Sequence, residues 1–309
     1  MVALYSEVWE GKTSLWIVSK YGPSNVGHRN SFPKMSNSVP TKTVFLTGAS
    51  SGIGRATAEL LSKQGYEVWG TARDISRLPQ LPGFHPVALD LNDAAQIATA
   101  FEKAAGEANG FEILINNAGD VINAPLEALV SNGLRTQMET LFFGPLELIR
   151  HALPEMRRRN SGCIINVTSL AVQFPIPFNS GYSAAKSALA SCSECLRLEL
   201  TGTNIRVVDV QPGDVHTEIL RRTRELNEPV CAAYEPNLSQ ARASEAGKME
   251  QACAPETVAR LLVNLLSDPS PPPRKTVGNF FEARLATTAS RILSRRMVER
   301  LQRLIYNLK

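Results

Sequence analysis

A tyrosine and a lysine lie four residues apart in the stretch NSGYSAAKSALAS, which covers residues 179–191. Only small residues separate Tyr182 from Lys186, and the flanking composition predicts a helix, in which positions four apart share one face. A free phenol has a pKa of about 10, which is too high for efficient proton exchange near neutral pH. A neighbouring ammonium favours the phenolate and lowers that pKa. Alone, so short a pattern is explained better by an ordinary half-buried helix, and only the rest of the chain can favour a proton-transfer pair.

A glycine-rich turn follows the first apolar run of the chain. In TGASSGIGRA, Gly48, Gly52 and Gly54 have the spacing G-x-x-x-G-x-G, between a strand-like run and a helical stretch. Gly48 allows a sharp turn, Gly52 allows close approach to a pyrophosphate, and Gly54 allows the helix to pack on the strand. The start of the helix then offers free N–H groups to the phosphates. The dinucleotide contacts expected in this loop are Thr47, Gly48, Ser50, Ser51, Gly52, Ile53 and Gly54.

The end of the next strand-like run indicates which dinucleotide is bound. Folds that bind NAD commonly have a carboxylate at this strand end, where it binds the adenosine ribose hydroxyls. In this chain the run ends in Ala72 and is followed by Arg73. A guanidinium can pair with the 2′-phosphate of NADP. We therefore expect NADPH/NADP+ to be preferred over NAD, with a solvated surface arginine as the alternative interpretation of Arg73.

Short apolar runs alternate with helical stretches from residue 43 onward. This alternation predicts βαβ units and therefore a single α/β domain, a Rossmann-type doubly wound parallel sheet with helices on both faces. The expected strands are 43–48, 66–72, 84–90, 111–119, 162–169 and 204–213, and the expected helices are 52–64, 93–105, 131–151 (with Pro145 inside it) and the one that carries Tyr182. Residues 214–254 lack strand signals and predict a helical substrate flap.

Both ends of the chain differ in composition from this domain, which we expect to cover residues 42–280. Residues 1–41 are rich in Ser, Asn, Gly and Pro without a sustained period, which predicts a disordered arm. Met35 is an alternative start of the native chain. A Pro-rich spacer, 267–274, precedes the tail. Residues 281–309 predict a basic amphipathic helix, because apolar residues recur every three or four positions between arginines.

The tail has two interpretations. From residue 284 to residue 309 it carries seven Lys or Arg and one Glu. Such a helix can make peripheral contact with an anionic membrane, or it can dock on its own domain or on a partner subunit. No apolar run approaches the roughly 20 residues that cross a bilayer, and the N-terminus lacks the apolar region of a secretory signal. We expect a cytoplasmic protein whose candidate for membrane contact is 284–309.

Composition limits the other classes of function. The chain has 309 residues, of which 43% are hydrophobic, and a net charge of +4, which is too weak to predict nucleic-acid binding. Its five cysteines are an odd number without a disulfide pattern, which indicates a reducing compartment. Cys192 and Cys195 form C-x-x-C on the helix after Lys186, where packing explains them better than a redox or metal pair does. No metal site is expected.

Five motifs occur together in this chain. They are TGxxxGIG at 47–54, Asp90 after the third strand, NNAG at 116–119, Ser169 thirteen residues before Tyr182, and PGDVHT at 212–217. With these motifs the sequence resembles the short-chain dehydrogenase/reductase family, in the subclass with the G-x-x-x-G-x-G loop, over roughly residues 42–280. The segment QMETLFFGPLELIR and the C-terminal extension resemble its hydroxysteroid- and retinol-dehydrogenase-like branch.

The resemblance implies an NAD(P)-dependent oxidoreductase that moves hydride between nicotinamide and a carbonyl carbon. Ser169 would position the substrate oxygen, Tyr182 would be the general acid in reduction and base in oxidation, and Lys186 would also hold the nicotinamide ribose. Asp90 would accept the adenine amino group, and Thr217 would hold the nicotinamide amide. The implied cofactor contacts outside the loop are Arg73, Asp90, Leu91, Asn116, Asn117, Ala118, Gly119, Tyr182, Lys186, Pro212, Gly213, Val215 and Thr217.

One position departs from the family pattern. The family usually has an asparagine on the fourth helix in the context N-x-x-G, where the disturbed backbone holds a water that supplies protons to the lysine. Here the matching residue is Leu141, three residues before Gly144. Leucine favours a regular helix and disfavours a helix-bound water. Either protons pass through other waters, or the chain binds NADP with weak or no catalysis and acts as a sensor or regulatory protein.

The expected substrate pocket is apolar, because hydrophobic residues follow NNAG and separate the serine from the tyrosine. They are Val121, Ile122, Phe174, Ile176 and Phe178. We expect a lipophilic ketone, aldehyde or secondary alcohol, with ordinary core packing as the alternative. A sugar-nucleotide epimerase or dehydratase shares Y-x-x-x-K but normally has the spacing G-x-x-G-x-x-G. Family precedent implies a homodimer or homotetramer through the helices around 131–151 and 181–200.

Overall fold

The computed structural model describes residues 6–9, 12–15, 42–129, 131–217, 228–279, 288 and 292–308. Contacts divide the chain into two compact units, Met1–Val39 and Pro40–Lys309. In the first unit, β1 (Ser6–Trp9) pairs antiparallel with β2 (Lys12–Leu15). The sequence predicts a disordered arm here, and this hairpin differs from that expectation. Strands of four residues are too short to show a clear period, so the pattern did not reveal them.

A seven-stranded parallel sheet, in the order β5-β4-β3-β6-β7-β8-β9, is the centre of the second unit. Its strands are β3 (Thr43–Leu46), β4 (Glu67–Ala72), β5 (Phe84–Ala88), β6 (Ile113–Asn116), β7 (Gly162–Val167), β8 (Ile205–Pro212) and β9 (Arg274–Val277). The order runs outward in opposite directions from the β3–β6 pair, which makes this pair the switch point of the sheet. The predicted doubly wound α/β fold is confirmed.

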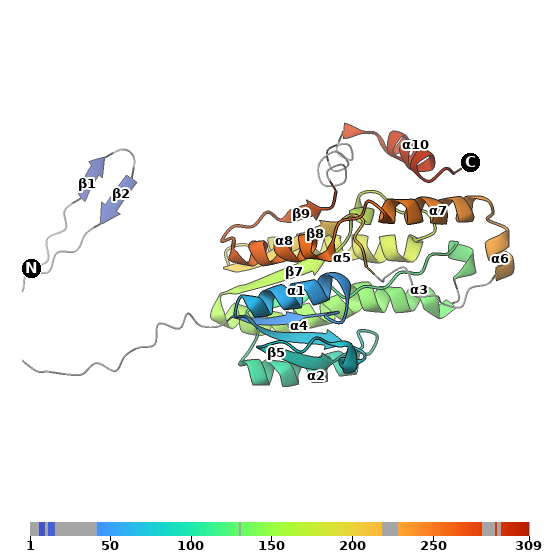
Figure 1. The fold of residues 1–309 in the computed structure, drawn as a ribbon. Coiled ribbons are helices and arrows are strands. Elements are labelled where there is room, and N and C mark those ends of the chain that lie inside the picture. Colours follow the sequence, from blue (N-terminus) through green and yellow to red (C-terminus); the bar gives the residue numbers. More distant parts are fainter. Residues whose placement is uncertain are drawn as a thin grey trace, which may run out of the picture. The chain divides into compact units, whose positions relative to one another are not determined.

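Helices cover both faces of the sheet (Figure 1). The helices α1 (Gly52–Lys63) and α8 (Pro255–Ser267) share one apolar core with the sheet, and α2 (Ala94–Ala108) and α4 (Gly144–Arg159) share another. Along β3, Val44 and Leu46 belong to the first core and Phe45 to the second. Successive side chains of a strand point to opposite faces, so one short strand contributes to both cores.

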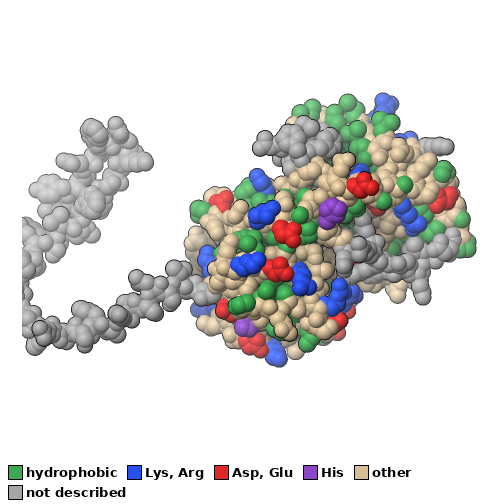
Figure 2. Space-filling model, in the orientation of Figure 1, with side chains coloured by type: hydrophobic (Ala, Val, Ile, Leu, Met, Phe, Trp, Pro, Cys, Tyr) green, Lys and Arg blue, Asp and Glu red, His purple; other side chains and the backbone are tan. Residues whose placement is uncertain are grey.

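Five further helices lie in the described part of the chain. They are α3 (Ser131–Met138), α5 (Ser180–Glu199), α6 (Glu228–Ala232), α7 (Asn237–Met249) and α10 (Arg295–Ile305). Of these, α5 packs along β7 and β8. The segment predicted as a flap, 214–254, contains α6 and α7, and a bridge between Val215 and Cys253 joins its ends. None of the described helices combines the length and hydropathy needed to cross a membrane. On the face shown in Figure 2, basic and acidic side chains are interspersed.

The helix α8 and the edge strand β9, near the C-terminal end of the domain, were not predicted from the sequence. Residues 267–274 were expected to be a spacer, but Arg274 already begins β9, and the amphipathic stretch before the spacer forms α8. The strand RKTV has no apolar alternation. It is held at the sheet edge by Arg274, whose guanidinium lies 2.8 Å from Asp209 Oδ2 and 2.7 Å from Glu194 Oε1. This tertiary ion-pair network has no local sequence signal.

Candidate active site

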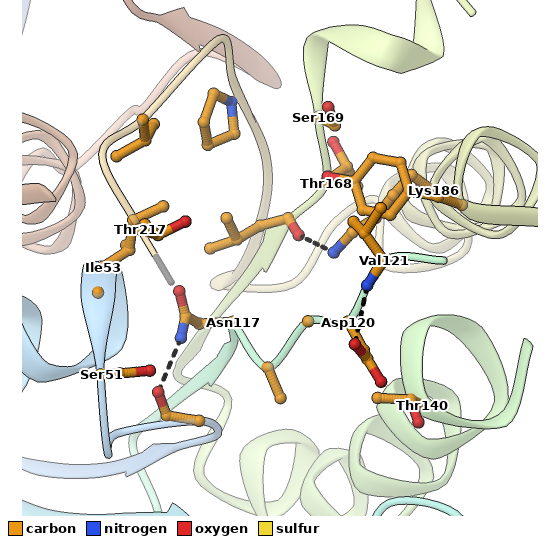
Figure 3. A pocket seen from close by; sticks show the side chains of 18 of the residues that line it. Ser51, Ile53, Asn117, Asp120, Val121, Thr140, Thr168, Ser169, Lys186 and Thr217 are labelled. Carbon is orange, nitrogen blue, oxygen red and sulfur yellow. Dashed lines mark hydrogen bonds between the residues drawn. The ribbon is translucent and has the colours of Figure 1, made fainter. Parts of the chain in front are cut away.

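A cavity of about 270 Å³ lies where the parallel strands end (Figure 3). It is lined by residues that follow four strands, namely Gly48 after β3, Asn117 after β6, Ser169 after β7 and Gly213 after β8. Loops at the carboxyl ends of parallel strands, next to the switch point, are the usual place for a nucleotide in such sheets. The position of the cavity therefore follows from the strand order.

Most of the predicted cofactor contacts line this cavity. They are Gly48, Ser50, Ser51, Gly52, Ile53, Arg73, Asp90, Leu91, Asn117, Ala118, Gly119, Tyr182, Lys186, Pro212, Gly213, Val215 and Thr217. The predicted residues Thr47, Gly54 and Asn116 do not line it, and each has a different place in the structure.

Thr47 and Gly54 hold the glycine loop against the segment that follows β6. The Thr47 hydroxyl accepts the backbone N–H groups of Asn117, at 2.9 Å, and Ala118, at 3.0 Å, and Asn117 Nδ2 donates to Thr47 O at 3.0 Å. A Cβ added at Gly54 would collide with Gly48 O and lie 2.5 Å from Asn117 Nδ2. Gly54 therefore allows contact between the loop and the segment after β6, a role that the helix-packing explanation missed.

The start of α1 offers unpaired backbone donors to the cavity. Gly48 and Gly52 have φ of 70° and 53°, a conformation that favours glycine. Ser51 is the N-cap residue, but its side chain makes no capping hydrogen bond, and the first turn has no acidic residue. The first N–H groups of a helix have no partner within the helix. They are therefore available to an anion, and the helix dipole favours negative charge there.

Asn116 is not at the cavity surface. Its side chain is 2% exposed, and its Nδ2 donates to Asn166 Oδ1 at 2.9 Å on the neighbouring strand β7. Asn166 Nδ2 in turn donates to Ser193 Oγ of α5 at 2.8 Å. The expectation that Asn116 lines the cofactor floor is wrong, because the last residue of β6 still alternates with its neighbours and points into the protein. Asn117, one residue later, faces the cavity (Figure 3).

The far end of the cavity is formed by the ends of β4 and β5. Asp90 Oδ1 accepts the backbone N–H of Asn92 at 3.0 Å and its side-chain amide at 2.7 Å. Arg73 is exposed at the rim of the cavity. Among the described residues, no acidic side chain forms an ion pair with Arg73. Its guanidinium is therefore available to an anionic ligand.

Ser169, Tyr182 and Lys186 converge on the opposite wall. Ser169 follows β7 and forms a hydrogen bond with Tyr182. Tyr182 and Lys186 are one turn apart on α5, as the spacing predicts. Lys186 is 4% exposed, and its Nζ donates to Val167 O at 2.7 Å and lies 5.9 Å from the centre of the Tyr182 ring. The three side chains thus line the same cavity, and Figure 3 shows where Ser169 and Lys186 lie in it.

Burial dominates the titration of this pair. It raises the pKa of Tyr182, the hydrogen bond with Ser169 lowers it, and the Asp214 carboxylate raises it further. Burial also lowers the pKa of Lys186 to about 8, against the opposing effect of Asp209. The sequence predicts that Lys186 and the positive charge of an oxidised nicotinamide together lower the pKa of Tyr182, whereas the protein's own groups give a net upward direction. The physical reason is that a buried phenolate loses hydration, and the Lys186 ammonium is directed at a backbone carbonyl.

Leu141 lies in a π-helical turn, Glu139–Phe143, between α3 and α4. Gly144 N donates to Glu139 O, five residues back, and Pro145 has no N–H with which to reach Leu141 O. The sequence predicts a long helix over roughly 131–151, with Pro145 tolerated or kinking it, and helix does cover this range. The expectation that a leucine at position 141 favours regular helix does not hold at this turn. Gly144 and Pro145 account for the irregular turn, so a fully buried leucine fits it as residue 141. The backbone disturbance associated with the family asparagine is therefore present without that asparagine.

The substrate end of the cavity differs most from its prediction. Of the five apolar residues expected, Val121 and Ile176 line the cavity, whereas Ile122, Phe174 and Phe178 do not. Phe178 packs instead in a small core under α6 and α7. The residues that sequence reasoning missed here are Asn179, Asp214, Glu245, Met249 and Tyr306. They come from separate elements, and no local pattern connects them.

The segment after β8 closes over the glycine loop. Its predicted contacts Pro212, Gly213, Val215 and Thr217 all line the cavity. A Cβ added at Gly52 would lie 2.9 Å from Thr217 Cγ2, so Gly52 allows this close approach. The two motifs are therefore in direct contact, although about 160 residues separate them in the sequence.

The C-terminal helix α10 docks on its own domain. Gln302 Nε2 donates to Pro175 O at 2.5 Å, and Tyr306, which is 7% exposed, lines the cavity. Lys248 Nζ of α7 lies 3.7 Å from the centre of the Tyr306 ring, a cation–π contact. Figure 1 shows α10 beside α7. Of the two interpretations of the tail, docking of the tail on its own domain is thus observed. Ile292, Met297 and Leu304 of the tail remain exposed to solvent.

Comparisons with known proteins agree with this geometry. A family model described as short chain dehydrogenase matches residues 42–228. A 3-ketodihydrosphingosine reductase from Bacteroides thetaiotaomicron is 32% identical over 252 residues, which are 80% of this chain and 91% of that protein. The family-model match includes the three residues that converge on the cavity wall.

Solved structures with the same fold are also similar in sequence. A short-chain dehydrogenase from Streptomyces avermitilis has a TM-score of 0.71 and 28% identity, over 88% of this chain and 100% of that chain. The closed form of a serine dehydrogenase complexed with NADP+ has a TM-score of 0.64 and 27% identity, over 76% of this chain and 94% of that chain. The similarity therefore extends to a structure with a bound nicotinamide cofactor.

Proposed function

The chain belongs to the short-chain dehydrogenase/reductase family of NAD(P)-dependent oxidoreductases, and from this premise we propose that it transfers hydride between NADPH or NADP+ and a lipophilic ketone, aldehyde or secondary alcohol. The observation that carries the proposal is the arrangement of Ser169, Tyr182 and Lys186 on one wall of a cavity whose other wall is the glycine loop.

The residues of the cavity fit a dinucleotide. The uncapped start of α1 offers backbone N–H groups to a pyrophosphate. Gly48 lets the loop lie directly against the segment after β6, because a Cβ there would lie 2.8 Å from Ala118 Cα. Asp90 can accept from an adenine amino group, and Thr217 can donate to a carboxamide. When bound, the nicotinamide supplies hydride in reduction and accepts it in oxidation.

Tyr182 is proposed to give its proton to the substrate oxygen in reduction and to take it back in oxidation. Ser169 would donate a hydrogen bond to the same oxygen and orient it. Because burial raises the pKa of Tyr182, the phenol stays protonated near neutral pH, which suits the general acid. Lys186, with a pKa lowered to about 8, can take up and release a proton in the working range, and we propose that it resupplies Tyr182.

Arg73 supports a preference for NADPH. The strand end before it provides Ala72 rather than a carboxylate, and the guanidinium has no ion pair among the described residues. Arg73→Ala should raise the Kd for NADPH by about 10- to 100-fold, the range for a lost charge-assisted hydrogen bond, and leave the Kd for NADH nearly unchanged. Fluorescence titration with both cofactors measures this. An equal effect on the two cofactors would contradict the preference.

The substrate class rests on the lining and on the relatives. Val121, Ile176, Met249 and Tyr306 give the substrate end apolar surface. The similar proteins are named for action on 3-ketodihydrosphingosine and on serine, compounds that carry a keto or hydroxyl function and also an amine. The direct test is NADPH oxidation with lipophilic ketones and aldehydes beside small charged ketones. Faster turnover of the small charged ketones would overturn the lipophilic assignment.

The second function left open by the sequence is NADP binding without useful catalysis, because of Leu141. The π-helical turn at Glu139–Phe143 favours the enzyme instead, since Gly144 and Pro145 already disturb the helix there. We expect Leu141→Asn to give no gain in turnover and to lower stability, because it places an amide where the side chain is 0% exposed. Activity that appears only in the Leu141→Asn variant would establish the binding protein instead.

We also propose self-assembly and membrane contact, each from exposed apolar side chains. Phe143, beside α4, and Leu198, on α5, are 46% and 77% exposed, which suits a homodimer or homotetramer through these helices. Exposed apolar residues with basic neighbours on α10 suit peripheral contact with an anionic membrane surface. Light scattering measures the first. Sedimentation with anionic vesicles, with and without residues 284–309, measures the second, and equal binding of both forms would contradict it.

A further inference from the structure

The substrate end of the cavity contains a carboxylate that the proposed proton transfer does not use. Glu245 of α7 lines the cavity beside Asn179 and Asp214. Its Oε1 accepts from Asn179 Nδ2 at 2.7 Å, and its Oε2 accepts from Asn123 Nδ2 at 2.9 Å. Burial, helped by the Asp214 carboxylate, raises the pKa of Glu245 to about 7 against the lowering effects of Lys248, the Asn179 hydrogen bond and Arg242. The carboxylate is therefore held in a defined position but poorly solvated.

No lysine or arginine among the described residues forms an ion pair with Glu245. The two basic side chains on the same helix contact other groups. Lys248 Nζ lies over the Tyr306 ring, and the Arg242 guanidinium donates to Asn123 Oδ1 and Asn123 O, both at 3.1 Å. Asp214 contributes a second negative charge at this end of the cavity. Lys248 and Arg242 oppose this charge from a distance, so what Glu245 lacks is a cation bonded directly to its carboxylate.

Asn179 gives an independent indication of a ligand. Its side chain is 2% exposed and lines the cavity, yet its Oδ1 accepts no hydrogen bond from any described residue. A buried acceptor without a donor is unfavourable, and such atoms are rare in folded proteins. Because Nδ2 of the same amide is bonded to Glu245, the unpaired oxygen and the carboxylate are close together. A donor with positive charge would satisfy both.

We propose that Glu245 and Asn179 bind a primary ammonium group of the substrate, so that the substrate is a lipophilic amino ketone or the corresponding amino alcohol. An ammonium has three N–H donors and no acceptor. It can therefore pair with the Glu245 carboxylate and donate to Asn179 Oδ1 at the same time. This inference rests on the proposed function and assigns the substrate class within it.

The ammonium site lies close to the reacting group. Asn179 is the N-cap residue of α5, three positions before Tyr182. The Asp214 carboxylate raises the pKa of Tyr182 and also that of Glu245, so it is within electrostatic range of both. Substrates whose amine lies close to the carbonyl or hydroxyl therefore suit this arrangement, and a vicinal amino alcohol is the simplest of them to test. The rest of such a molecule would contact Met249 and Tyr306.

A purely structural role of Glu245 explains its contacts with Asn123 and Asn179 less well than a ligand site does. If Glu245 only joined α7 to the segments of Asn123 and Asn179 by hydrogen bonds, a neutral side chain would serve as well. Such a role also leaves the unpaired Asn179 oxygen unexplained. Charge and structure can be separated, because a merely structural role changes all substrates alike. Selectivity between an amine and its neutral isostere changes only if Glu245 faces that amine.

The experiment compares oxidation, with NADP+, of a long-chain vicinal amino alcohol and of the same alcohol with methyl in place of the amine. The wild-type protein should prefer the amine in kcat/KM by about 10- to 100-fold, the range of a charge-assisted hydrogen bond. Glu245→Gln should reduce this ratio to about one, and Glu245→Asp should retain part of it. Glu250→Gln, an exposed glutamate one residue beyond α7, is the matched control and should keep the full ratio.

A binding measurement supports the kinetic one. Hexylamine should raise the thermal midpoint of the wild-type protein and of the Glu250→Gln control more than hexanol does, and Glu245→Gln should abolish that difference. Oxidation of both alcohols without preference for the amine would overturn the ammonium site and leave the proposed function intact. A preference that survives in a folded Glu245→Gln variant would also overturn it. Failure to oxidise any alcohol or reduce any carbonyl would instead contradict the proposed function itself.

Discussion

The cofactor end of the cavity is built from backbone that turns tightly after β3 and β6, whereas the substrate end is built from side chains on α5, α7, α10 and the loops between. At the cofactor end, Gly48 and Gly54 leave no room for a Cβ, and Thr47 accepts hydrogen bonds from the next segment. At the substrate end, Glu245 precedes the Pro-rich segment 267–274 in the sequence and Tyr306 follows it, and both side chains reach the same cavity. The first end is fixed by close backbone contacts that only glycine permits and the second by side-chain packing between helices, so substitutions should affect them differently.

The largest effect is expected where the two ends meet. Tyr182→Phe removes the proton donor and acceptor, so kcat should fall by about 10²- to 10⁴-fold, the usual contribution of general acid–base catalysis. The Kd for NADPH and the thermal midpoint should change little, because the ring remains. Single-turnover kinetics and cofactor titration measure this. A Phe variant that keeps more than a tenth of wild-type turnover would mean that another group transfers the proton.

A single added methyl group should weaken cofactor binding. Gly54→Ala places a Cβ against Gly48 O and Asn117 Nδ2, so the loop must shift. We expect the Kd for NADPH to rise by at least about 10-fold, which corresponds to the strain of an overpacked site.

Gly106→Ala is the matched control for that substitution. Gly106 lies in α2, and an added Cβ would meet nothing within 4 Å. Alanine should therefore stabilise the protein by about 0.5–1 kcal/mol through its helix propensity. Cofactor titration and thermal unfolding of both variants test the comparison. Equal cofactor affinity in the two variants would mean that the loop does not depend on Gly54.

The substrate end should respond to the tail without a change at the cofactor end. Tyr306→Ala removes a buried ring and its contact with Lys248. The KM for lipophilic substrates should rise by about 5- to 30-fold, from lost apolar burial and the cation–π contact. Leu304→Ala, at a position 74% exposed on the same helix, should leave KM unchanged. If Tyr306→Ala weakened NADPH binding equally, the two ends could not be treated as separate.

The smallest predicted effect is a pH dependence of substrate selectivity. Because the pKa of Glu245 is raised to about 7, its carboxyl is neutral below that pH and charged above it. The preference for an amine over its neutral isostere should therefore increase several-fold as pH rises through about 7. The charged groups that act on Glu245 are Asp214, Lys248 and Arg242. Titration of Tyr182 or Lys186 affects both substrates alike and cancels in the ratio.

If the preference for the amine over its neutral isostere did not vary with pH, the negative charge that binds the ammonium would belong to a group other than Glu245. The Glu245→Gln variant provides the reference, because it has no carboxyl to titrate at this position. Its selectivity should be low and constant over the same pH range.

The same contrast explains what the sequence could predict. The glycine spacing, the pair Tyr182 and Lys186, and Ser169 lie in short segments whose place in a parallel sheet follows from the strand pattern. Asn116 was misplaced by one residue, because the pattern does not say where alternation ends. A kink from Pro145 was left open, but the π-helical form of the turn at Leu141 was not predicted, because it depends on where the Gly144 N–H finds its acceptor. Glu245 and Tyr306 were missed because only the packing of α7 and α10 brings them to the cavity.

The docking of α10 has a thermodynamic consequence. Since Tyr306 is part of the cavity wall, occupancy of the substrate end and attachment of the tail are linked equilibria, and each must strengthen or weaken the other by the same factor. Whatever else binds α10, whether a membrane surface or a second protein, would then compete with or assist the substrate through a single aromatic ring. The C-terminus would in that way act as a sensor of the occupancy of the site.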